Sequence, residues 1–385
     1  METVTNALGY VYLDHAATSP LRPEASVAME PFGDVMFANP SGSHRFAREA
    51  RRAIDEARDI VAAAIGCRPG EVVFTSGGTE GANAAVLGAV RRHGGRAVCP
   101  AAEHHAVLHC VEHAGGVVVP VATSGSVDPD VLRSVLDATE DVTVVSVMTV
   151  NNETGAVTDM EKVSHAVRGR AENAILHTDA VQAACWMDLR TVWPHVDVLT
   201  LSAHKFGGPK GVGVMVVREG TVLEPLMLGG GQERDRRSGT HNVAGIVGTA
   251  EALRVTDENR HDEVIRVRTL RDSLVSRLVA AVPCAVPTLP PGEGSAGTAH
   301  LCLDGLESES LLYLLDTAGV CVSAASACAS GAMEPSHVLA AMGVPRSRIN
   351  GSLRFSLGHT TTPHDIDAAV DATVAAAERL LAARP

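Results

Sequence analysis

The chain has 385 residues, 45% hydrophobic and 20% charged, which is long for a single hydrophobic core and predicts two globular domains. The formal net charge of −13 argues against non-specific binding to nucleic acid or to an anionic membrane, since both need a basic surface. No apolar run approaches the length of a bilayer span, and the N-terminus lacks the charged-then-apolar pattern of a signal peptide.

Eight cysteines are spread along the chain with no Cys-x-x-Cys pair. In a chain without the pattern of a signal peptide, this spacing predicts free thiols in a reducing compartment rather than a disulfide framework. We therefore expect a cytoplasmic protein.

Short β-branched runs alternate with helical patterns from about residue 71. The expected strands are 71–74, 97–99, 117–121, 142–150, 174–179, 196–202 and 212–217. Strands that read as continuous apolar runs between helices indicate a mostly parallel sheet buried on both faces. The sequence thus predicts an α/β fold whose larger domain, 15–256, holds a seven-stranded sheet. A helix at 242–254 is expected to close this layer.

The C-terminal third of the sequence has a different pattern. A charged helix is expected around 257–281, followed by a Pro/Gly-rich loop at 287–297. Strands near 299–303, 320–323 and 352–356 then alternate with helices near 308–317, 334–342 and 363–382. This pattern predicts a smaller α+β domain formed by 1–14 and 257–385.

A glycine-rich turn follows the first expected strand. Gly77, Gly78 and Thr79 stand between that strand and the start of a helix. Glycines let the backbone approach an anion, the helix N-terminus offers N–H groups, and Thr79 adds a hydroxyl. The turn therefore predicts a phosphate site, although a plain turn with a helix cap has the same pattern.

An acid and a lysine follow two neighbouring strands. Asp179 ends one expected strand, and Lys205 comes just after the next, flanked by Ser202, His204 and glycines. An acid that can pair with a pyridinium nitrogen and a lysine that can form a Schiff base are what pyridoxal 5′-phosphate (PLP) requires of a protein. The alternatives are a loop-capping Asp179 and a solvated Lys205, but small neighbours are unusual around a surface lysine.

Eight motifs occur in order from about residue 12 to about 360. They are YLDHAATSPL (12–21), FTSGGTE (74–80), EHHAV (103–107), VNNETG (150–155), HTDAVQ (177–182), SAHKFGGPKG (202–211), RSGTHN (237–242) and RFSLG (354–358). Together they resemble the NifS/IscS-like cysteine desulfurases, in the class V aminotransferase branch of the fold-type I PLP enzymes. The resemblance implies a PLP-dependent homodimer that converts L-cysteine to L-alanine and leaves a persulfide on an active-site cysteine.

The resemblance also implies roles for the catalytic residues. Lys205 would carry the cofactor, Asp179 would pair with its pyridine nitrogen, and His104 would stack on the ring and assist proton transfer. Cys328 would accept the sulfur.

Further roles concern binding. Gly78, Thr79, Ser202 and His204 would hold the cofactor phosphate, joined by Thr240 of the neighbouring subunit. As an alternative for the last motif, Ser238 or Thr240 could simply cap a helix.

The remaining implied roles concern the cofactor ring and the substrate. Asn152 and Gln182 would form hydrogen bonds near the ring oxygen. Arg354 would receive the substrate carboxylate, a task that suits the bidentate fork of arginine.

Cys328 lies in a run of Ala, Ser and Gly, residues that cannot anchor a loop by burial. We therefore expect the segment at about 323–333 to be mobile, so that its thiolate can reach the substrate sulfur and then deliver the persulfide. The length of this loop resembles the desulfurases that supply iron–sulfur cluster assembly and tRNA thiolation. The expected partner is a protein acceptor, either an iron–sulfur scaffold or a tRNA-thiolation enzyme.

Three alternatives remain open. His105, His109 and His113 share one helix face, but the Glu of an H-E-x-x-H zinc motif is missing, and we expect no metal site. A selenocysteine lyase or another class V aminotransferase would share the cofactor residues. A non-catalytic binding subunit of a sulfur-transfer complex would have lost Lys205 or Cys328, and both are present.

Overall fold

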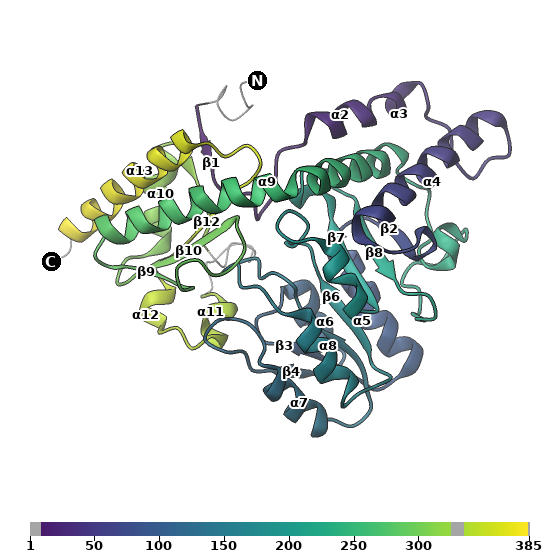
Figure 1. Cartoon of the computed structure of the whole chain (residues 1–385), viewed down its shortest axis with the longest axis horizontal. Helices are drawn as coiled ribbons and strands as arrows, with labels where there is room; N and C mark the ends of the chain where they lie inside the picture. The colour runs from purple at the N-terminus through teal and green to yellow at the C-terminus, as the bar shows by residue number, and fades with distance from the viewer. Residues whose placement is uncertain (1–8, 325–334, 384–385) are drawn as a thin grey trace.

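The computed structural model describes residues 9–324 and 335–383, which form two packed units that share one long helix (Figure 1). The helices of the larger unit are α2 (Pro23–Met29), α3 (Pro31–Asp34), α4 (Arg45–Ile65), α5 (Gly78–His93), α6 (His105–His113), α7 (Pro129–Asp137) and α8 (Met160–Arg168). Its strands are β2 (Val72–Thr75), β3 (Arg96–Pro100), β4 (Val117–Val119), β5 (Val142–Ser146), β6 (Ile175–Asp179), β7 (Val198–Ser202) and β8 (Gly213–Val217).

These strands form one seven-stranded sheet in the order β2-β8-β7-β6-β5-β3-β4. β8 runs antiparallel to both of its neighbours, and the other pairs are parallel. The predicted seven-stranded, mostly parallel sheet is therefore confirmed.

Helices cover both faces of the sheet, which explains its continuous apolar strands. α5 and α6 pack on one face against alternate strand residues such as Val144 and Val198. α4, α7 and α8 pack on the other face, against residues such as Val145 and Leu199. Because successive side chains point to opposite faces, a strand buried on both sides needs apolar residues at every position.

The long helix α9 (Val243–Ala281) corrects one prediction. The sequence predicted two helices, 242–254 and 257–281, whereas the structure has a single helix of 39 residues. The rise in charge near 257 marks a change in what the helix packs against, and no Pro or Gly occurs there to end it. Within the described residues, no helix is both long and apolar enough to cross a membrane. The predicted domain boundary at 256 and 257 lies inside α9 and stays a prediction.

The smaller unit packs on the second half of α9. Its elements are β1 (Val11–Tyr12), β9 (Ala285–Pro287), β10 (Thr298–Leu303), α10 (Ser308–Thr317), β11 (Val320–Cys321), α11 (His337–Ala341), α12 (Arg346–Ile349), β12 (Ser352–Ser356) and α13 (Pro363–Ala382). β12, β10 and β9 form an antiparallel sheet, and β1 pairs in parallel with β11. Leu13 thereby joins the core of the smaller unit, although it is close to the N-terminus.

One glycine permits a close approach between a strand and the turn after β2. Gly213 stands opposite both Thr75 and Ser202 in the sheet register. A Cβ atom at this position would lie 2.6 Å from the backbone of Gly77. Glycine at 213 therefore lets the turn before α5 lie directly against the start of β8.

Candidate active site

A cavity of about 370 Å³ lies where β6 and β7 end, and ten of the twelve site residues predicted from the sequence line it. They are Gly78, Thr79, His104, Asn152, Asp179, Gln182, Ser202, His204, Lys205 and Arg354. Thr240 does not line the cavity, and Cys328 lies outside the described residues. The carboxyl ends of parallel strands are where ligands bind in sheets of this kind, and the volume suits a small-molecule pocket.

The start of α5 forms one wall of the cavity. Gly77 precedes the helix in an extended conformation and supplies no side-chain cap, so the first N–H groups are left for a ligand. A Cβ atom on Gly78 would lie 2.6 Å from Cγ2 of Val181. Thr79 and Ser202 add hydroxyl groups beside this turn. The donor set therefore fits an anion such as a phosphate.

Asp179 is a buried carboxyl group with few partners. Its side chain accepts a hydrogen bond from the Val181 N–H at 3.0 Å. Burial raises the pKa of Asp179 to about 6, and the positive charge of Lys205 acts in the opposite direction. A cationic ring nitrogen in the cavity would favour the ionised carboxylate, which is what a pyridinium partner requires.

Lys205 ends a short 3₁₀ turn, Ala203–Lys205, directly after β7. Its Nζ donates to the carbonyl oxygens of Ala16 and Ala17, at 2.6 and 2.8 Å. These two residues follow β1, so a segment near the N-terminus positions the amine on the cavity wall.

Two histidines on the cavity wall are neutral at pH 7. Burial, reinforced by the nearby Lys205 charge, lowers the pKa of both His104 and His204 to about 4. Nδ1 of His104 accepts the Ala106 N–H at 3.0 Å and caps α6, so the ring proton is on Nε2. The His104 ring can therefore donate from Nε2 to a group in the cavity.

Arg354, which belongs to β12 of the smaller unit, also lines the cavity. The side chain is buried, and Nη1 donates to the Asn152 carbonyl at 2.8 Å. Nη2 donates to Oδ1 of Asp14 at 2.9 Å. Among the described residues, Nε of Arg354 and Oδ1 of Asn152 are buried with no hydrogen-bond partner. These orphaned atoms fit a polar ligand that contains both donors and acceptors.

Sequence reasoning missed Asp14 and Ser323, which also line the cavity. Asp14 lies inside the motif YLDHAATSPL but was given no role. Asp14 could have been recognised as a candidate site residue, because it is a carboxylate in a motif whose other residues are mostly small or apolar. Gln182 Nε2 donates to the carbonyl of Ala16 at 2.9 Å, so it supports the segment that holds Lys205.

Thr240 is exposed on the segment between β8 and α9. Glu233 anchors this segment, because it pairs with Arg58 at 2.7 Å and with Nε2 of His241 at 2.8 Å. These partners outweigh burial and lower the pKa of Glu233 to about 2. Arg237 pairs in addition with Glu80 of α5.

The N-terminus of α9 is capped by a residue other than the two considered from the sequence. The side chain of Asn242 accepts the Gly245 N–H at 3.0 Å and caps the helix. The alternative that Ser238 or Thr240 provides this cap is therefore wrong.

The histidine-rich face of α6 packs against α11. The His105 ring stacks on His109 at 4.7 Å and lies 4.3 Å from the His337 ring, between centroids. Nε2 of His337 lies 2.9 Å from the Glu103 carbonyl oxygen. Across residues 9–324 and 335–383, no group of three or more His, Cys, Asp or Glu side chains is arranged to hold a metal ion.

The described cysteines all carry free thiols. Burial raises the pKa of Cys185 to about 11 and that of Cys67 to about 12. Such thiols are mostly protonated at pH 7 and are weak nucleophiles.

Comparisons with known proteins agree with this architecture. The family described as aminotransferase class-V matches residues 11–369. The chain is 40% identical to a cysteine desulfurase IscS of Dictyoglomus turgidum, over 97% of this chain and 96% of that protein. It is 42% identical to an IscS-like cysteine desulfurase of Mycobacterium tuberculosis, over 96% of each.

Solved structures share the fold. A NifS-like protein superposes with a TM-score of 0.89 at 32% identity, covering 97% of this chain and 99% of its own. SspA, solved in complex with cysteine, superposes with a TM-score of 0.74 at 28% identity, over 90% of this chain and 98% of its own.

Proposed function

The chain belongs to the class-V aminotransferase family and is a PLP-dependent cysteine desulfurase, and we propose that Lys205, Asp179 and Arg354 perform its chemistry in the cavity at the ends of β6 and β7. These roles are supported by the fact that three residues far apart in the sequence come together at one site. An amine, a buried carboxyl group and a buried guanidinium from distant parts of the chain line one cavity of about 370 Å³.

The wall of this cavity suits the parts of the cofactor. The open N-terminus of α5, with Thr79 and Ser202, would bind the phosphate, and Asp179 would pair with the ring nitrogen. Lys205 would attach the cofactor through Nζ. When bound, PLP supplies an electron sink that weakens bonds at the substrate carbons next to the amino group.

The substrate is held by its carboxylate and exchanges protons with His104. Arg354 receives the carboxylate of L-cysteine through donors that include its unpartnered Nε. The neutral His104 ring, with its proton on Nε2, hands that proton to a neighbouring group and takes it back. SspA, a structural relative solved in complex with cysteine, supports this choice of substrate.

The sulfur acceptor within the chain is Cys328 in this proposal. Its thiolate attacks the substrate sulfur, the C–S bond of L-cysteine breaks, and an S–S bond forms. The carbon keeps the electron pair of the broken C–S bond and takes up one of the two thiol protons, which gives the methyl group of L-alanine, while the other proton stays with the persulfide. Cys328 is thereby left as a persulfide. The support comes from the run of small residues around Cys328 in the sequence, SAASACASG at 323–331, and from the weak nucleophilicity of the buried thiols elsewhere.

The persulfide passes to a protein acceptor, which we propose is an iron–sulfur scaffold or a tRNA-thiolation enzyme. A net charge of −13 favours a protein over bare RNA as the direct partner. Free thiols at the described cysteines support a cytoplasmic location.

The activity itself is tested with the purified enzyme and L-cysteine in the presence of dithiothreitol. We expect L-alanine and sulfide to form in equal amounts over many turnovers, because the reductant releases the persulfide sulfur and restores the thiol. Amino-acid analysis and a sulfide assay measure the two products. Pyruvate formation, or alanine without sulfide, would contradict the desulfurase assignment.

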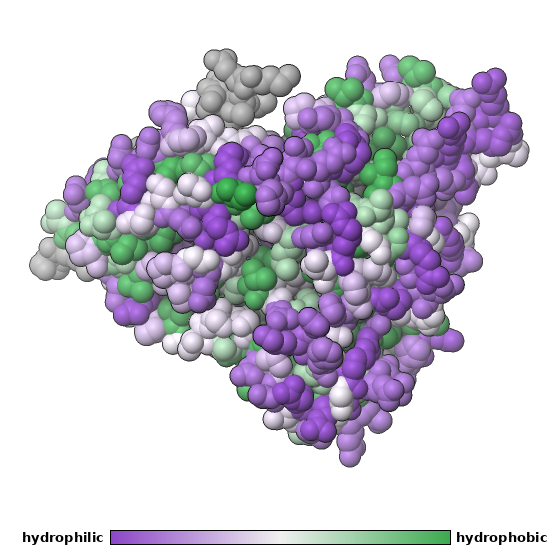
Figure 2. All heavy atoms as spheres, viewed as in Figure 1, coloured by the Kyte–Doolittle hydropathy of each residue, from purple (hydrophilic) through white to green (hydrophobic). Residues whose placement is uncertain are grey.

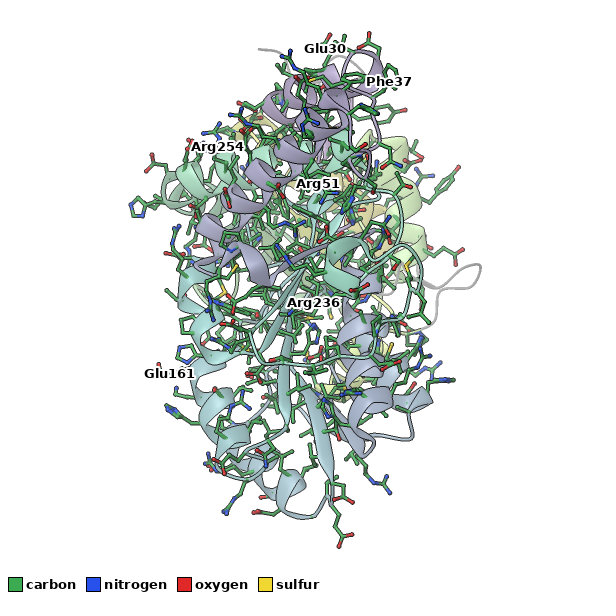
Figure 3. The ribbon with its side chains drawn as sticks, turned by 90° about the vertical axis from the view of Figure 1, so that its right-hand side faces the viewer. Glu30, Phe37, Arg51, Glu161, Arg236 and Arg254 are labelled. Carbon is green, nitrogen blue, oxygen red and sulfur yellow. The ribbon has the colours of Figure 1, made fainter. Side chains whose placement is uncertain are left out.

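We also propose a homodimer in which Thr240 completes the phosphate site of the partner. Thr240 is exposed and lies outside its own cavity. Figure 3 shows the molecular face that contains Arg51 and Arg236, with Phe37 projecting near one end. Phe37, Val35 and Leu228 are strongly exposed, and Figure 2 shows hydrophobic residues over α2 and α3. Exposed apolar surface of this kind is typical of interfaces between subunits.

Analytical sedimentation checks this pairing. The PLP-loaded enzyme is expected to sediment at twice the mass of the 40.0 kDa chain. An active, PLP-loaded monomer would rule out the contribution of Thr240 from a partner.

A further inference from the structure

Arg354 already has an anionic partner inside the cavity. Its side chain is 6% exposed, and Nη2 lies 2.9 Å from Oδ1 of Asp14. The Asp14 side chain is 21% exposed and lines the same cavity. A carboxylate of this chain therefore occupies part of the guanidinium fork that the substrate carboxylate is proposed to use.

The backbone fixes both members of this pair. Arg354 exchanges backbone hydrogen bonds with Ser323 and stands opposite His300 in the β10–β12 register. Asp14 forms a parallel bridge with Ser356, two residues further along β12. Because both ends are held by strands of the smaller unit, the Asp14–Arg354 pair is preformed.

The segment that follows Asp14 contacts the other cation of the site. The carbonyl oxygens of Ala16 and Ala17 accept hydrogen bonds from Lys205 Nζ. Residues 14–17 therefore contact both Arg354 and Lys205. The contact with Arg354 is made by the charged carboxylate of Asp14, and the contact with Lys205 is made by neutral carbonyl groups. Only the contact with Arg354 changes the net charge offered to a ligand.

We propose that Asp14 sets the affinity of the cavity for amino-acid carboxylates, by orienting the Arg354 fork and by offsetting part of its positive charge. This inference rests on the proposed role of Arg354. With Asp14 ionised, an arriving carboxylate meets a pair with no net charge and lies close to a like charge. Its binding is therefore weaker than binding to Arg354 alone.

Weaker carboxylate binding has a use in this reaction. L-Cysteine and L-alanine contain the same carboxylate. Any increase in the affinity of the cavity for this carboxylate therefore strengthens the binding of substrate and product equally. Such uniform binding lowers KM without accelerating the chemical step, and it slows the departure of L-alanine. Asp14 thus acts as a positioning and affinity-setting residue for both ligands.

Asp14→Asn tests the proposal, because the amide oxygen can still accept from Nη2 while the charge is removed. We expect the dissociation constant of L-alanine to fall roughly tenfold in the PLP-loaded enzyme, with lower KM for L-cysteine and lower kcat. Cysteamine, which has the amine and thiol of cysteine but no carboxylate, is expected to bind the variant and the wild type equally. Calorimetry and the visible absorbance of the loaded enzyme measure both ligands.

Asp304→Asn is the matched control, because Asp304 pairs with Arg348 at 3.2 Å on the surface, away from the cavity. It removes the same charge and is expected to leave L-alanine binding unchanged. Asp14→Ser repeats the test with a second neutral residue if the Asn variant folds poorly. An unchanged or weaker affinity for L-alanine in the folded Asp14 variants overturns the proposal. Failure of the wild type itself to bind L-alanine or turn over L-cysteine would instead contradict the proposed function.

Discussion

Lys205→Ala is expected to lower desulfurase turnover on the order of 10³-fold or more and to remove the visible absorbance of bound PLP. The reason is that Lys205 provides the only lysine amine on the cavity wall among the described residues. In the proposed mechanism it both attaches the cofactor and moves protons at the substrate. Absorbance spectra and the alanine assay measure the two effects. The loss should persist with excess PLP, because free cofactor cannot replace the missing amine.

Lys210→Ala provides the matched control for this variant. Lys210 lies in the same motif five residues later, but it is exposed and does not line the cavity. The Lys210 variant is expected to keep both its absorbance band and its turnover. Substantial turnover by Lys205→Ala, with a wild-type spectrum, would mean that another group attaches the cofactor.

Cys328→Ser is expected to abolish persulfide formation and to reduce alanine production to the background level. L-Cysteine should still change the visible spectrum of the variant, because the proposed binding residues Lys205, Asp179 and Arg354 are intact. Mass spectrometry of the wild type after one turnover should find one added sulfur atom on the peptide containing Cys328. A serine hydroxyl cannot accept the sulfur, so neither product is released at an appreciable rate.

Cys67→Ser is the control for a general effect of removing a thiol, since Cys67 is partly buried and does not line the cavity. It should retain full turnover. A Cys328 variant that works at the wild-type rate would favour the alternatives that need no cysteine, such as an aminotransferase or a selenocysteine lyase. An aminotransferase would release a keto acid, whereas a lyase would prefer selenocysteine to cysteine.

The parts of the fold that could be predicted are those with a local physical signature. The seven strands were recognisable because burial on both faces requires continuous apolar runs, as in Val198–Ser202. The turn before α5 was recognisable because only glycines let the backbone come close to an anion. Asp179 and Lys205 could be proposed as site residues because Asp179 ends such a strand and Lys205 comes shortly after the next one.

The features that could not be predicted depend on contacts between distant residues. Asp14 and Arg354 are separated by 340 positions, so no periodicity or spacing connects them. Glu233 pairs with Arg58, 175 positions away, and its neighbours along the chain do not suggest a buried acid. α9 was divided in two because its polarity changes, although a change in packing partner leaves a helix intact.

The continuity of α9 limits how the two halves of the cavity can move. Thirty-nine residues at 1.5 Å each give a rod about 58 Å long. Leu253 of this rod belongs to the core beneath Asp179 and Lys205, and Leu274 belongs to the core beneath Arg354. Any swivel of one unit on the other must bend this rod, and intact helices bend only gently. The separation between Arg354 and Lys205 is therefore held nearly constant, and if these residues bind the two ends of the substrate as proposed, it restricts the length of amino acid that can bridge them.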